Sequence, residues 1–159
     1  MKKIKILAVL VLMIAIAVPA FAAYDIYLQA EGVAGTANDA THKDWIQVSE
    51  IKDNTLKTGG TVGLVISKAI DSNSGSLYRK CLTGTPMQNA QLDVCKDGVL
   101  FFRILLRDVA IGQIKPELIS GNPKEELTFG FKQINWEYFS ADGKSLGRNG
   151  WDNELKRPL

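Results

Sequence analysis

The sequence has few of the residues on which most metal and enzyme sites depend. Its 159 residues include one histidine, His42, and two cysteines, Cys81 and Cys95. The cysteines lie too far apart for a Cys-x-x-Cys pair, and no second histidine is present to complete a ligand set. The loop carboxylates do not follow a calcium-loop pattern. We therefore expect neither a metal nor a cofactor.

The sequence has only one long hydrophobic run, at its N-terminus. Three lysines precede the apolar residues 6–18, and small residues follow them. This pattern predicts a secretory signal peptide over residues 1–22, with cleavage between Ala22 and Ala23. The alternative is an uncleaved anchor, but a run of about 13 residues is short for a membrane span, which needs about 20.

Removing this segment changes the charge of the chain. It takes away three of the 19 Lys and Arg residues and none of the 17 Asp and Glu residues, so the net charge moves from +2 to about −1. A near-neutral protein has no general attraction to nucleic acid or anionic lipid. We expect residues 23–159 to form a single exported domain, periplasmic or extracellular, without nucleic acid and without stable membrane insertion.

Alternation of apolar and polar residues dominates the rest of the chain, which is typical of β-strands. Asp97-Gly98 is a hairpin signal. The pattern predicts seven strands, over residues 24–31, 45–51, 61–70, 90–95, 99–109, 110–118 and 125–139.

One segment has helical spacing instead. N-cap residues precede residues 76–83, where apolar side chains share one stripe, and Gly84 and Pro86 end the helix. The sequence thus predicts a mainly β protein, a barrel or sandwich of about seven strands with one short flanking α-helix.

The strand expected over residues 99–109 is apolar on both faces. Leu100, Phe102, Ile104 and Leu106 form one face, while the other carries three further apolar residues. These are Val99, Phe101 and Leu105. A strand that is wet on one side should have a polar outer face, so we expect either the helix or another subunit to cover these three.

The two cysteines could form a disulfide in an oxidising compartment. Cys81 lies in the apolar stripe of the helix, and Cys95 points away from the side of Leu92 and Val94. A helix on the outer side of that sheet would bring the two sulfurs together in a disulfide. The alternative is two unpaired, partly buried thiols.

The signs of catalysis are weak. His42 has no evident partners for a triad, and we expect it to make a structural hydrogen bond. Ser49 and Lys52 fit the Ser-x-x-Lys motif of penicillin-binding enzymes, and residues 57–59 fit Lys-Thr-Gly. That motif needs a helix, whereas this segment alternates as a strand. We therefore expect no enzymatic activity.

An ordered set of short matches resembles the Hcp family, the haemolysin-coregulated proteins. The matching segments are residues 24–28, 31–35, 41–48, 76–84, 91–94, 106–111, 126–129, 134–138 and 150–152. The resemblance implies a small β-barrel of two sheets with a helix at its side. It also implies a non-enzymatic subunit of a six-membered ring, related to the inner tube and secreted effector of type VI secretion.

The partners that the resemblance implies are further copies of the chain, secreted cargo and other type VI components. Two features differ from the family pattern. The family normally lacks a signal peptide, and the segment at residues 52–60 stands where a longer, glycine-rich loop contributes to contacts between rings. The alternative is a monomeric periplasmic or extracellular module that binds a small ligand or glycan.

Overall fold

The computed structural model describes residues 24–52, 63–118 and 121–159. The expected signal peptide with its cleavage site, and residues 53–60 of the short segment, lie outside the described residues. The strands are β1 (Tyr24–Ala30), β2 (Ile46–Val48), β3 (Glu50–Lys52), β4 (Leu64–Ala69), β5 (Met87–Lys96), β6 (Val99–Glu117), β7 (Lys124–Phe139), β8 (Ser145–Asp152) and β9 (Arg157–Pro158), and the helix is α1 (Ser74–Thr83).

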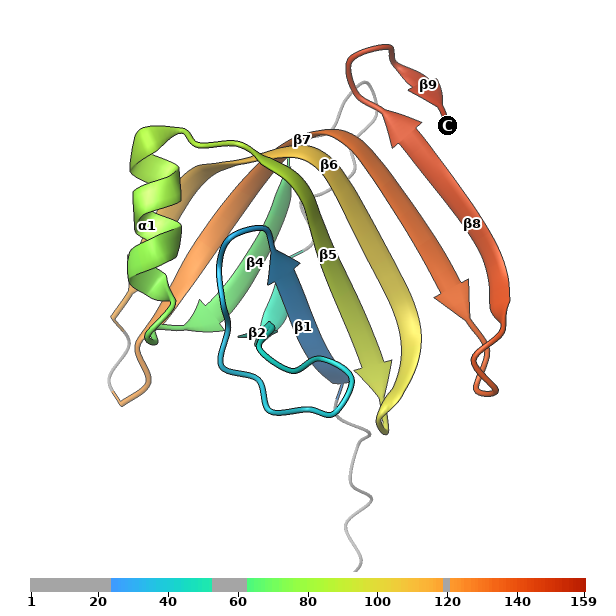
Figure 1. The fold of residues 1–159 in the computed structure, drawn as a ribbon, viewed down its shortest axis with the longest axis horizontal. Helices are drawn as coiled ribbons and strands as arrows, with labels where there is room; N and C mark the ends of the chain where they lie inside the picture. Colours follow the sequence, from blue (N-terminus) through green and yellow to red (C-terminus); the bar gives the residue numbers. More distant parts are fainter. Residues whose placement is uncertain (1–23, 53–62, 119–120) are drawn as a thin grey trace, which may run out of the picture.

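These strands form one antiparallel sheet that curves strongly, with α1 beside it (Figure 1). The order is β2-β1-β5-β6-β7-β4-β3, while β8 extends the sheet from β7 and carries β9. β2 and β3 lie at opposite ends of this order, yet only Ser49 separates them in the chain. The Ser49 backbone N–H and hydroxyl both donate to the Ser67 carbonyl at 2.8 Å. The sheet therefore curls back on itself.

The expected architecture, mainly β with one short flanking helix, is confirmed. The ladder of hydrogen bonds is continuous and curls back on itself, which is consistent with the expected barrel. The expected strands 99–109 and 110–118 are one strand of 19 residues, β6, whose register against β7 shifts between Ile111 and Gln113. The alternation predicts neither β8 nor β9, because most β8 side chains are exposed and two of its residues are glycines.

The helix and the hairpin follow their local signals. Gly84 has φ 62°, and its N–H and that of Thr85 close the last turn of α1 on the carbonyls of Cys81 and Lys80. At the turn from β5 to β6, Asp97 and Gly98 both have positive φ, as a two-residue hairpin requires. Both local predictions are confirmed.

The main hydrophobic core lies on the inner face of the curved sheet. Its largest members come from six strands and the helix: Leu28, Ile46, Leu64, Ile66, Leu77, Met87, Leu92, Leu106, Leu127 and Phe129. Leu77 carries α1 into this core, whereas Leu82, expected on the same helical stripe, is exposed. The helix is thus attached to the inner side of the sheet.

An ion pair closes one end of this inner face. Lys68 on β4 and Glu125 on β7 are both fully buried, and Lys68 Nζ lies 2.8 Å from Glu125 Oε1. The ammonium also donates to Asp71 Oδ1 at 3.0 Å, and Ser74 in the first turn of α1 donates to Glu125 Oε1 at 2.8 Å. This cluster, Lys68, Asp71, Ser74 and Glu125, is called the inner cluster below. It ties the start of α1 to two strands.

Candidate interaction surfaces

The first surface is an apolar groove of about 360 Å³ between the tips of the β5–β6 and β7–β8 hairpins. Phe101 is 44% exposed and Leu146 is 70% exposed. Tyr24, 52% exposed, places its ring 6.1 Å from that of Phe101. The groove, called the tip groove below, is lined by Val99, Leu100, Phe101, Phe139, Ala141 and Leu146.

A shift in strand register creates this surface. Val94 pairs with Phe102, but Cys95 pairs with Leu100, so Phe101 is an extra residue in β6. The shift turns Leu100 away from the core face that strict alternation predicts. Leu100 packs instead with Tyr27 and Cys95 in a second, smaller cluster on the outer face.

The helix does not cover the three residues singled out in the sequence. Val99 and Phe101 are exposed at the tip groove, whereas α1 packs against the main core through Leu77. Leu105 is half-buried and lies apart from them, in an open groove beside the loop that joins β1 to β2. The structure brings two of the three together and separates the third. Tyr24 and Leu146, which no sequence pattern indicated, complete the surface.

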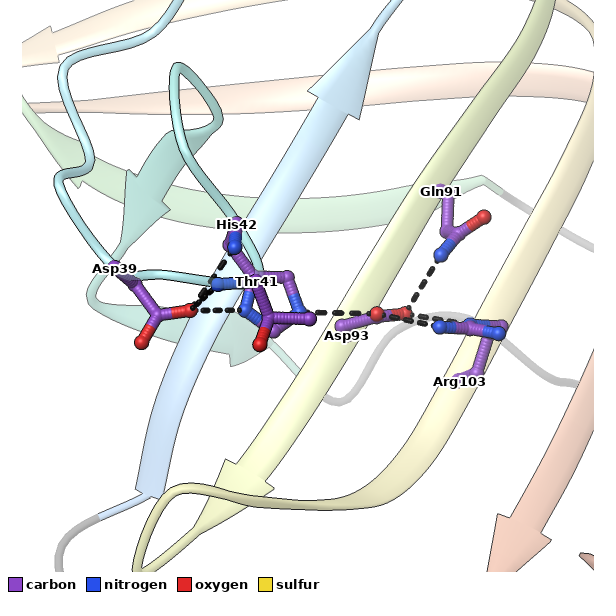
Figure 2. A network of polar contacts seen from close by, with 6 residues as sticks. All are labelled: Asp39, Thr41, His42, Gln91, Asp93 and Arg103. Carbon is purple, nitrogen blue, oxygen red and sulfur yellow. Dashed lines mark hydrogen bonds and ion pairs between the residues drawn. The ribbon is translucent and has the colours of Figure 1, made fainter. Parts of the chain in front are cut away.

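A buried polar network lies under the β1–β2 loop, residues 31–45. Figure 2 shows it running from the loop across β5 to β6. His42 Nδ1 lies 2.8 Å from Asp39 Oδ1, and Nε2 lies 3.1 Å from Asp93 Oδ2. Arg103 donates to both oxygens of Asp93 at 2.7 Å, and Gln91 donates to Oδ1. Asp39, His42, Asp93 and Arg103 are called the outer cluster.

Aromatic rings hold the imidazole of His42 in place. It stacks on Tyr27 with ring centroids 4.4 Å apart and meets the edge of Trp45 at 4.9 Å. Only 4% of His42 is exposed, so neither face of the ring is open to a substrate. The expected structural role of His42 is confirmed, and its partners lie up to 51 residues away in the sequence.

The hydrogen bonds of the outer cluster favour ionised carboxylates. The His42 side chain and the backbone N–H groups of Thr41 and His42 lower the pKa of Asp39. Burial works against the charged form of Asp93, but hydrogen bonds and charge from Arg103, with help from His42, outweigh it and lower the pKa.

The expected disulfide is absent from this structure, where Cys81 and Cys95 are free thiols. Cys95 does face outward, as its position in the strand predicts, but the β1–β2 loop covers that face, whereas Cys81 packs against the inner core. The sheet therefore separates the two sulfurs. Burial, and to a smaller extent the charge of Asp93, raises the pKa of the Cys95 thiol to about 11, which makes it unreactive at neutral pH.

The Ser-x-x-Lys match is not assembled into a catalytic pair. Ser49 donates to a backbone carbonyl, and Lys52 forms ion pairs with Glu117 and Glu126 at 3.6 and 2.7 Å. Within residues 24–52, 63–118 and 121–159, no group of three or more His, Cys, Asp or Glu side chains is placed to hold a metal. Over the same ranges, no helix has the length and apolar character needed to cross a bilayer.

Comparison with known proteins then decides the family. Residues 27–138 match the family model described as "Type VI secretion system effector, Hcp". The chain belongs to this Hcp family. No curated protein sequence matches the chain.

Solved structures of other Hcp proteins share the fold. Hcp1 from Salmonella typhimurium superposes with a TM-score of 0.78 at 23% identity, covering 86% of this chain and 99% of that one. A type VI secretion system effector from Yersinia pestis gives 0.74 at 24% identity, covering 80% and 99%. Hcp2 from S. typhimurium gives 0.74 at 22% identity, covering 84% and 98%. At these identities the likeness concerns the fold.

Proposed function

We propose that this Hcp-family chain is a non-enzymatic structural subunit that assembles into a six-membered ring, as a component of type VI secretion. Its working parts are surfaces that bind further copies of the chain and secreted cargo, with no catalytic residues and no cofactor. Membership of the Hcp family and the superposition on Hcp1 support this proposal.

The observation that carries the proposal is the uncovered tip groove. A head-to-tail ring needs two different, complementary surfaces on each subunit. Exposed apolar side chains that gather in one place mark such contact surfaces. Phe101, Leu146 and Tyr24 gather in this way at the hairpin tips, on strands rather than on a loop.

Light scattering coupled to size exclusion tests the ring with the mature protein, residues 23–159. We expect a mass six times that of one chain. The double variant Phe101→Asp, Leu146→Asp should be monomeric, because a carboxylate in an apolar contact loses its hydration. The matched control is Leu82→Asp, which changes a leucine on α1 that is even more exposed than Leu146 and should leave the mass unchanged. A wild-type monomer at about 50 µM would overturn the ring, since ring contacts of useful affinity are occupied at that concentration.

We also propose that the protein is exported by a signal peptide cleaved between Ala22 and Ala23, which the charge and apolar pattern of residues 1–22 supports. Intact mass of the exported protein tests this, with a chain that begins at Ala23 as the expected result. Retention of residues 1–22 would contradict it.

The alternative function is a monomeric exported binding module. One observation favours it, namely the open groove beside the β1–β2 loop. A monomer that binds a ligand there would support this alternative over the ring.

A further inference from the structure

The open groove beside the β1–β2 loop has the dimensions of a ligand site. Its volume is about 840 Å³, within the range of about 300–1,000 Å³ typical of small-molecule sites. Strands β1 and β5 and Leu105 of β6 supply its floor, and the loop supplies its wall. The residues that the proposal uses are Gln29, Asn89, Gln91, Leu105 and Trp45, and the groove is called the loop groove below.

Hydrogen bonds hold the loop that forms the wall of the loop groove in one conformation. Gly35 donates to the carbonyl of Asp44 at 2.7 Å, and Ala37 donates to that of Trp45 at 2.9 Å. A Cβ atom on Gly35 would lie 2.0 Å from the backbone of Trp45, so only glycine permits this approach. The outer cluster then fixes the loop to β5 and β6 through His42. The groove is therefore formed before any ligand arrives, which lowers the entropic cost of binding.

Side-chain amides gather on the floor. Gln29 and Gln91 are direct partners in the β1–β5 ladder, and Asn89 lies two residues before Gln91 on the same strand face. Gln91 donates to Asp93 Oδ1 at 3.0 Å, which orients its amide. No hydrogen bond among the described residues engages the side chains of Gln29 or Asn89. An amide both donates and accepts, as a sugar hydroxyl does, so these groups match a ligand rich in hydroxyls.

The remaining lining gives this site one apolar side and little net charge. Trp45 and Leu105 are the larger apolar residues of the lining, and an indole suits the flat C–H face of a sugar ring. Trp45 is half-buried and also packs against His42 and the second, outer cluster of apolar residues. Glu31, Lys43 and Asp44 also line the groove, so charges of both signs are present. A polyanion would meet two carboxylates and a single ammonium there, which disfavours it.

We propose that the loop groove binds a short neutral oligosaccharide. Trp45 packs against one sugar ring, and the amides of Gln29, Asn89 and Gln91 exchange hydrogen bonds with its hydroxyls. Binding of this kind does not depend on the assembly of a ring, because every group comes from one chain.

The test is an NMR titration of the ¹⁵N-labelled mature protein with three neutral trisaccharides, namely chitotriose, cellotriose and maltotriose. We expect at least one to produce saturable shifts at the side-chain amides of Gln29 and Asn89 and at the Trp45 indole N–H, with a Kd below about 5 mM. The double variant Gln29→Ala, Asn89→Ala should bind at least about tenfold more weakly, since both amides are exposed and their loss leaves the fold intact. The matched control, Gln113→Ala, changes an exposed amide on β6 outside the groove and should bind as the wild type does.

Three results would overturn the proposal. The first is no saturable shift with any trisaccharide at about 10 mM, a concentration that half-fills even a site of only 10 mM Kd. The second is saturable shifts that map outside the groove. The third is binding of triglutamate or trialanine in place of every trisaccharide, which would assign the groove to a peptide. The proposed ring is unaffected by any of these results.

Discussion

The inner and outer clusters bury charge in the same small protein but in different ways. In the inner cluster, Lys68 and Glu125 are both fully buried on the core face, and their partners join two strands to the start of a helix. In the outer cluster, Asp93 is buried, but Asp39 is 37% exposed and Arg103 is 29% exposed. The central ion pair of the inner cluster is closed to water, and only Asp71 at its edge is 25% exposed, whereas the outer cluster fastens a loop and keeps contact with water at both ends.

This difference indicates which charged side chains can be replaced with only a small loss of stability. A charge sealed in a core has no water to replace a missing partner, so removing one member of the pair is costly. Asp93 is different, because it accepts hydrogen bonds from three side chains, those of Arg103, Gln91 and His42. When one of these partners is removed, the other two still bind the carboxylate. We therefore expect a large effect at the inner cluster and graded effects at the outer one.

The largest effect is expected from Lys68→Met, which keeps the length of the side chain and removes its charge. Glu125 would remain buried without a cation, and its Oε2 already has no hydrogen-bond partner. We expect the free energy of unfolding in urea to fall by about 3–5 kcal/mol. The double variant Lys68→Met, Glu125→Leu should recover much of this loss, because it removes both charges. A loss below about 1 kcal/mol for the single variant would show that water reaches the inner cluster.

A smaller effect is expected from His42→Ala in the outer cluster. It removes hydrogen bonds to Asp39 and Asp93 and the stacking on Tyr27, while Arg103 continues to hold Asp93. Bonds to charged groups contribute about 1.5–3 kcal/mol each, and partial replacement by water at Asp39 keeps the total near the lower end, at about 2 kcal/mol.

The control His42→Phe keeps an aromatic ring that can stack on Tyr27 and removes the hydrogen-bonding nitrogens, although its ring is one atom larger. Its free energy of unfolding should lie between those of the wild type and His42→Ala. If His42→Ala lowered the free energy of unfolding by more than Lys68→Met does, the inner cluster would not be the more sensitive of the two to the loss of a partner.

The sequence predicted the features that depend on neighbouring residues, but not those that depend on contacts between distant segments, such as the two clusters. Local signals predicted α1 with its Gly84 cap, the Asp97-Gly98 hairpin and most strands, because each depends on neighbouring residues. The register shift at Cys95 is not visible locally, so alternation placed Leu100 on the wrong face. The expected disulfide was wrong because strand parity shows which way Cys95 points but not what covers it.

The contacts of both clusters join residues that are distant in sequence. Lys68 meets Glu125 across 57 positions, and His42 meets Asp93 across 51. Nothing near Lys68 in the sequence indicates burial, since a lysine in an amphipathic strand is normally solvent-exposed. Only the Asp39-x-x-His42 spacing, which suits a local side-chain turn, could have indicated part of the outer cluster.

The smallest effect on the free energy of unfolding is expected from lowering the pH. It acts through Asp93 of the outer cluster. Its pKa is lower in the folded protein than in the unfolded chain, because the hydrogen bonds and charge of Arg103 and the bond from His42 outweigh the effect of burial. The unfolded chain therefore takes up a proton first as the pH falls. The stabilisation that this carboxylate provides is complete above the unfolded pKa of about 3.9 and is lost as the pH falls through the folded value.

Urea unfolding at a series of pH values between 2 and 6 measures this effect against Asp93→Asn, which cannot titrate. The variant should be less stable at pH 6, and the gap between the two proteins should narrow below about pH 4, where Asp93 of the unfolded wild-type chain begins to take up a proton while the folded protein still holds it ionised. A gap that stays constant down to pH 2 would mean that the folded state does not favour the ionised form of Asp93. The bidentate pair with Arg103 would then position the strands without stabilising the charge of Asp93.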